Sequence, residues 1–142
     1  GQQRLQHAYA YNDLLQQLGW LPNGSDFPVE HINPLYGFYA AVARKDLEGY
    51  PEEGFQTENA LNRQQALKAM TIWAARGMFE EDLKGSIEAG KNADFVVAEK
   101  DIMEIPMNQV PEVEVLRTFV RGQEVYYKSP ALPAGGQTTN SK

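Results

Sequence analysis

The amino-acid sequence of 142 residues contains no cysteine. This absence excludes a disulfide framework, a thiolate metal site and a cysteine nucleophile, and it leaves the redox compartment open. Histidine is nearly as rare, since His7 and His31 are the two imidazoles of the chain. They stand far apart, and the His-x-His pair on which zinc sites are commonly built is missing.

Long apolar runs and basic stripes are also missing. No apolar stretch approaches the roughly 20 residues that a membrane-spanning helix needs. The 13 Lys and Arg residues against 19 Asp and Glu residues give a net charge of −6. Nucleic acid and anionic membrane surfaces are poor partners for such a chain. We therefore expect a soluble protein with no nucleic-acid partner and no membrane partner.

The length and the composition point to a small globular unit. The chain is long enough for one domain but far below the ~250 residues of a TIM barrel. Hydrophobic residues make up 42% and charged residues 23%, close to the averages of globular proteins. The chain starts at Gly1 instead of Met, inside a polar helical pattern. The sequence therefore predicts a piece of a longer precursor.

Three segments have the apolar periodicity or the capping residues of helices, namely Arg4–Leu18, 35–44 and 62–77. Gly19 is a typical C-terminal stop for the first. Asn33 and Pro34 form an N-cap signal for the second, which is apolar nearly all round and should be buried. Asn62 and Gln65 form a capping box for the third. The segment 45–59 has no period and predicts a surface loop.

Short strands are expected mainly after Glu80, in the runs Ser86–Glu88, Ala93–Ala98 and Glu114–Tyr127, the last broken by a hairpin turn at 121–123. Trp20–Pro28 allows one earlier strand that runs into a turn. The sequence thus predicts a mixed α+β unit with a boundary near residue 80. The expected parts are residues 1–79, residues 80–128 and a disordered tail over 129–142.

Asp26 is the strongest candidate for chemistry. It ends the motif Gly24-Ser25-Asp26, where a strand would run into a turn of small residues. Barrel enzymes place metal ligands and general bases at such strand ends. A carboxylate there can bind a divalent cation, take a proton from metal-bound water and give it to the leaving group. The alternative is ordinary turn chemistry, in which Asp26 bonds its own backbone.

Three other residues have a structural and a functional interpretation. His31 follows the Asp26 turn and could line a pocket near it, although a loop histidine is more often solvated. Arg44 closes an apolar helix, where a cation complements the helix dipole; it would contact an anionic substrate if the helix end faced a cleft. Asp94 is expected to tie a turn together instead of acting in catalysis.

The order of motifs along the chain resembles the carboxyl end of metal-dependent amidohydrolases, most closely amidohydrolase family 3 and its YtcJ-like group. The residues that carry this resemblance are Arg4 with the Tyr-rich helix after it, Gly24-Ser25-Asp26-Phe27-Pro28-Val29, Asn33-Pro34-Leu35, Ala41-Val42-Ala43-Arg44, Gln65-Ala66-Leu67 with Thr71 and Ala74-Ala75, Gly85–Val97, and Val120-Arg121-Gly122 with Val125-Tyr126. Single motifs are weak evidence, but their order covers all of the chain except the tail.

The resemblance implies an α/β fold, in which the chain supplies the last strand and helices of a (β/α)8 TIM barrel and the C-terminal strands of a small β-sandwich subdomain. Trp20–Ser25 resembles the eighth barrel strand, with Asp26 at its end. The family hydrolyses C–N bonds in amide-like small molecules with one or two divalent metals, usually zinc. Asp26 would then be both metal ligand and proton shuttle.

The same resemblance implies that the other metal ligands lie upstream of Gly1. One carboxylate is too little for a stable zinc site, so the chain alone is expected to bind no zinc stably and to be inactive. Barrel strands and helices without their neighbours leave unpaired edges and apolar surface, which predicts self-association. The alternative function is a non-catalytic binding or assembly module. A His-x-His after an upstream strand would decide between the two.

Overall fold

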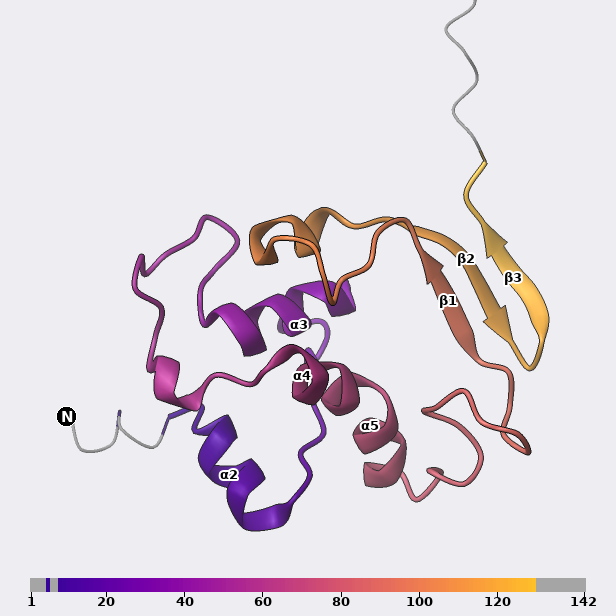
Figure 1. The fold of residues 1–142 in the computed structure, drawn as a ribbon, viewed down its shortest axis with the longest axis horizontal. Coiled ribbons are helices and arrows are strands. Elements are labelled where there is room, and N and C mark those ends of the chain that lie inside the picture. The colour runs from indigo at the N-terminus through magenta and orange to yellow at the C-terminus, as the bar shows by residue number, and fades with distance from the viewer. Residues whose placement is uncertain (1–4, 6–7, 130–142) are drawn as a thin grey trace, which may run out of the picture.

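The computed structural model describes residue 5 and residues 8–129, and Figure 1 shows their arrangement. A helical part contains α2 (Tyr11–Leu18), α3 (Pro34–Ala43), η1 (Thr57–Asn59), α4 (Arg63–Met70) and α5 (Ile72–Gly77). A sheet at one side of it contains β1 (Phe95–Ala98), β2 (Val115–Val120) and β3 (Gln123–Tyr127), with η2 (Met107–Glu112) between the first two strands along the chain. The predicted mixed α and β class is confirmed. Arg4, His7 and all of the predicted tail except Ser129 lie outside the described residues.

Local capping residues set the helix ends as the sequence predicts. The Asn33 side chain accepts a hydrogen bond from the backbone N–H of Leu35 at 3.0 Å, at the start of α3. Asn62 and Gln65 form the reciprocal capping box of α4, with hydrogen bonds of 2.9 and 2.8 Å. Gly19 ends α2 at a φ of 73°. Among the described helices, none is long and apolar enough to cross a membrane.

Two of the predicted helices are interrupted. The expected continuous helix over Arg4–Leu18 is wrong, because Tyr9 has a φ of 55°, which an α-helix cannot contain, and α2 begins at Tyr11. The expected helix over 62–77 is two helices, with a break at Thr71 (φ −124°, ψ −97°). The Thr71 hydroxyl donates to the carbonyl oxygen of Leu67 at 2.6 Å. Such side-chain bonds to the preceding turn bend helices.

Two of the predicted strands are not formed in the described chain. In the segment Trp20–Pro28 the backbone N–H of Asn23 donates to the carbonyl oxygen of Ala69 in α4, at 2.9 Å, so the chain runs along a helix. A strand needs a neighbouring strand for its backbone hydrogen bonds, and none of the described residues offers one here. Ser86–Glu88 lies between Gly85 and Gly90, both at positive φ, and belongs to a series of turns.

The remaining strands form the antiparallel sheet in the order β1-β2-β3. Arg121 and Gly122 join β2 to β3 with φ values of 51° and 77°, the left-handed pair that tight hairpin turns require. The carboxylate of Asp94 accepts a hydrogen bond from the backbone N–H of Arg121 at 2.7 Å. Asp94 therefore has the structural role that the sequence predicts, although the turn that it ties belongs to the hairpin.

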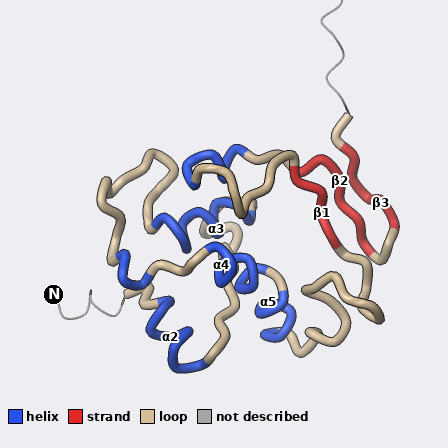
Figure 2. The backbone as a smooth tube through the Cα atoms, in the orientation of Figure 1, coloured by secondary structure: helices blue, strands red, loops and turns tan. Residues whose placement is uncertain are grey.

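The core lies where α3, α4 and η2 meet (Figure 2). Phe38 and Val110 are its largest fully buried side chains. The other buried members of the cluster are Leu15, Leu35, Ala41, Leu61, Ala66, Ala69 and Val113. The segment that carries Val110 is held by Arg63 of α4, which donates to the carbonyl oxygens of Ile102 and, at 2.6 Å, Ile105. The core thus combines residues from both sides of the predicted boundary near residue 80, which stays a prediction.

Candidate functional site

A cavity of about 750 Å³ lies beside α3, and we call it the α3 cavity. Its walls come from Tyr9 and Tyr11, the segment 23–31, one face of α3 and the segment 44–55. Tyr36, Ala40 and Arg44 follow one another every four residues and face the cavity, whereas Leu35 and Phe38 enter the core. The helix is apolar nearly all round because one side packs into the core and the other lines the cavity.

Asp26 lines the α3 cavity from the turn that follows residues 20–25. It is exposed and has a φ of 53°, a left-handed conformation that Asp and Asn tolerate better than most residues. The carbonyl oxygen of Asp26 accepts a hydrogen bond from the backbone N–H of Val29 at 2.8 Å, which closes the turn. The described residues form no strand before Asp26, but its carboxylate stands at a cavity.

His31 lines the same cavity, as the sequence suggested for a residue just beyond the Asp26 turn. Its Nδ1 accepts a hydrogen bond from the backbone N–H of Asn33 at 3.0 Å. The neutral ring must therefore carry its proton on Nε2. The ring centroid lies 4.9 Å from that of Tyr36, so the imidazole is held at the N-terminal end of α3.

Arg44 is the C-cap of α3, at a φ of 56°, and it also lines the cavity. The end of α3 thus faces a cavity, which is the condition under which the sequence predicts that Arg44 contacts an anionic substrate.

The sequence did not point to Tyr36, Tyr50 or Phe55, which line the cavity as well. The four-residue spacing of Tyr36 and Arg44 could have indicated a shared face. Tyr50 and Phe55 lie in a loop without periodicity, so their position depends on tertiary structure.

A metal site is not complete within the described residues, because no three His, Asp or Glu side chains come together to hold an ion. Catalytic zinc sites use three protein ligands. The residues described do not fit a metal by themselves, and Asp26 could supply one ligand at most.

The comparisons with known proteins agree with these motifs. A protein-family model described as "Amidohydrolase family" matches residues 1–126 of the chain. The chain belongs to the amidohydrolase family. This amidohydrolase chain is 32% identical to YtcJ of Bacillus subtilis, an amidohydrolase by name, over 91% of the chain and 24% of YtcJ. It is 35% identical to the N-substituted formamide deformylase of Arthrobacter pascens, over 69% of the chain and 18% of that protein.

A solved structure, the amidohydrolase from Thermotoga maritima, is 30% identical, with a TM-score of 0.42 over 50% of this chain and 17% of that one. The amidohydrolase chain therefore spans a quarter or less of the curated relatives that it matches, at 24% and 18% of their lengths. The predicted resemblance to amidohydrolase family 3 is confirmed.

Proposed function

We propose that this chain is the C-terminal part of a longer metal-dependent amidohydrolase that hydrolyses C–N bonds in amide-like small molecules. Family membership and the N-substituted formamide deformylase among the relatives support C–N bond hydrolysis. The small share of each relative that the chain covers supports a longer parent protein.

The observation that carries the proposal is Asp26, an exposed carboxylate at the wall of a cavity large enough for a small molecule. In the proposed reaction Asp26 accepts a proton from the attacking water and returns it to the leaving nitrogen. A divalent metal, expected to be zinc, would polarise the substrate when bound. Asp26 would be one of its ligands, and the others would have to come from parts of the parent protein outside this chain.

We propose that the parent protein completes a (β/α)8 barrel around this chain. We propose that residues 20–25 are the eighth strand, which would pair with neighbours that the described residues do not include. The helices α3, α4 and α5 would be the last on the outside of the barrel. The sheet β1-β2-β3 would be the C-terminal share of a β-sandwich whose other strands come from the parent.

The test is to assay hydrolysis of an N-substituted formamide by the parent-length protein and by the 142-residue chain. The parent should release amine and formate, lose this activity with a chelator and regain it with added zinc. The chain alone should show no turnover, because its single candidate ligand cannot hold a catalytic metal. Turnover by the chain alone that rises with added zinc would contradict this assignment, as would a parent that lacks a His-x-His after an upstream strand.

The isolated chain should also self-associate. Its sheet exposes apolar side chains on both faces, Val96 (56% exposed) and Tyr126 (48%) on one and Val125 (59%) on the other. Light scattering at high concentration should therefore show dimers or larger species. Val125→Lys should shift the population toward monomer, whereas Leu83→Lys, at an exposed leucine outside the sheet, should not. A monodisperse monomer of the unchanged chain would show this proposal to be wrong.

A further inference from the structure

Arg44 is one of the most buried charged side chains of the described chain, with 6% of its surface exposed. Its terminal nitrogen Nη2 is buried and has no hydrogen-bond partner among the described residues. Burying a guanidinium without a partner for each donor is unfavourable, and buried charges are therefore normally paired. The helix dipole alone does not need such burial, since an exposed cation at a helix end also interacts favourably with the dipole.

The guanidinium of Arg44 is held in one place from several sides. Its Nε donates to the carbonyl oxygen of Phe55 at 2.8 Å, while the N–H of Phe55 donates to the carbonyl oxygen of Arg44, also at 2.8 Å. The rings of Tyr11 and Phe55 lie 5.3 and 5.5 Å from the guanidinium carbon, within range of cation–π attraction. A fixed donor loses little conformational entropy when it binds an acceptor.

Gly54 makes this arrangement possible. Its φ is 81°, and a Cβ at this position would lie 2.7 Å from Cγ2 of Thr57 and 3.2 Å from the carbonyl oxygen of Ala43. The chain can therefore pass close to the end of α3 only with glycine here. This close approach brings Phe55 against Arg44.

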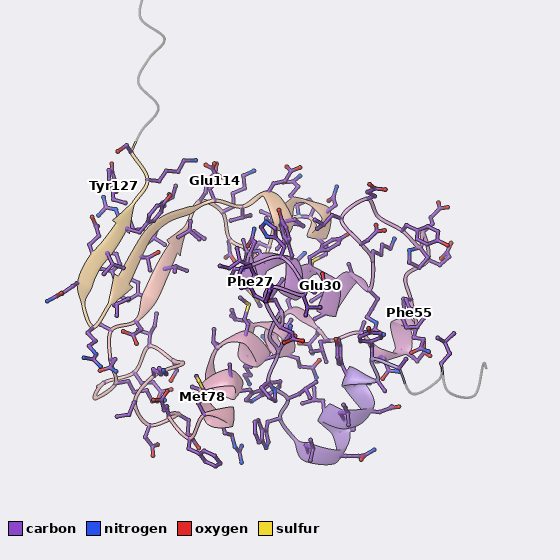
Figure 3. All side chains as sticks on the ribbon, turned by 180° about the vertical axis from the view of Figure 1, so that it is seen from behind. Phe27, Glu30, Phe55, Met78, Glu114 and Tyr127 are labelled. Atoms are coloured by element: carbon purple, nitrogen blue, oxygen red, sulfur yellow. The ribbon has the colours of Figure 1, made fainter. Side chains whose placement is uncertain are left out.

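We propose that Arg44 forms an anion-binding subsite of the α3 cavity and receives a carboxylate group. Nη2 is a buried donor without a partner among the described residues, it belongs to a residue that lines the cavity, and a planar guanidinium matches the geometry of a carboxylate. The role of this subsite in holding a substrate beside Asp26 rests on the proposed function. Glu30 and Phe55 are two residues of the cavity wall, and Figure 3 labels both, some distance apart.

The other charges of the cavity favour a singly charged ligand. Asp26, Glu30 and Asp46 line it together with Arg44 and Lys45, so acidic groups outnumber basic ones. The Lys45 ammonium donates to the carbonyl oxygen of Glu52. This acidic surplus repels any anion, but it repels a phosphate dianion more strongly than a carboxylate, whose single charge the Arg44 guanidinium neutralises.

The subsite can be tested on the 142-residue chain without any assay of turnover. Propionate, titrated into the protein, should shift the NMR signal of the Arg44 Nε–H in a saturable manner, and the uncharged isostere propionamide should not. Arg44→Lys should weaken propionate binding about tenfold or more, because an ammonium lacks the planar fork. The matched control Arg76→Lys changes an arginine that lies over the Trp20 ring outside the cavity, and it should leave binding unchanged.

An Arg44 signal that propionate does not move, or equal propionate affinity in Arg44→Lys, would overturn the proposal. The first of these measurements uses the unchanged chain and holds even if the variant fails to fold. In the parent-length protein, a signal that propionate still moves assigns the subsite to a free carboxylate ligand. If the Arg44 signal of the parent already lies where propionate would move it, and propionate leaves it unchanged, then an Asp or Glu of the parent occupies the subsite. An inactive parent would contradict the proposed hydrolase but not this subsite.

Discussion

Replacing Asp26 with asparagine should lower kcat of the parent-length enzyme on an N-substituted formamide by about 10²- to 10⁴-fold, the usual contribution of a general acid–base group. The amide has nearly the shape of the carboxylate but cannot accept the proton from water. The fold should remain, since Asp26 is exposed and asparagine tolerates its φ of 53°. The variant should therefore keep the circular dichroism spectrum and the unfolding midpoint of the unchanged protein.

A matched control is Asp101→Asn. Asp101 is likewise an exposed turn aspartate, and its Oδ1 accepts a hydrogen bond from the N–H of Met103 at 2.8 Å, which an asparagine oxygen can also accept. It lies outside the α3 cavity. Its kcat should stay within about twofold of the unchanged enzyme, in line with the small effects of surface substitutions. Near-normal turnover of Asp26→Asn would remove Asp26 from the proposed reaction.

The parts of the fold that local interactions determine could be predicted from the sequence. The capping residues Asn33, Asn62 and Gln65 act over two or three positions, and the hairpin at Gly122 needs only residues that accept positive φ. The break at Thr71 goes with a side-chain hydrogen bond to the carbonyl oxygen of Leu67, which apolar periodicity does not reveal. The strand expected at 20–25 needs partners, and a pattern in one segment says nothing about whether its neighbours are present.

The candidate site, like the fold, could be predicted from the sequence only in part. The types and order of residues singled out Asp26, His31 and Arg44, and the structure brings all three to one cavity. What the sequence could not indicate is the burial of Arg44, because this depends on Phe55 reaching the end of α3 through a loop without periodicity. The buried Nη2, unpaired among the described residues, is a property of tertiary structure, and it gives Arg44 a more specific role than a helix-dipole cation.

Phe38→Ala should lower the free energy of unfolding of the chain by about 3–5 kcal/mol, the range for deleting a buried phenylalanine ring. Phe38 is 0% exposed and belongs to the core between α3, α4 and η2. Several of its fellow core residues are the alanines 41, 66 and 69, whose short side chains cannot move to fill the space. Such a loss is a large part of the ~5–15 kcal/mol that stabilises a typical domain.

Denaturant unfolding followed by circular dichroism would measure this loss, and two variants make the result specific. Phe38→Leu keeps most of the volume and should lose less than about 2 kcal/mol, so it remains measurable if Phe38→Ala does not fold. Phe79→Ala removes the same ring from a side chain that is 93% exposed and should change the free energy of unfolding by about 0.5 kcal/mol or less.

Because α3 carries Phe38 on its core face and Tyr36 and Arg44 on its cavity face, loss of this core packing should also loosen the cavity wall. Phe38→Ala should then weaken the propionate-induced shift of the Arg44 signal, while Phe79→Ala retains it in full. An unchanged unfolding midpoint in Phe38→Ala would mean that α3 is held in place by something other than this core.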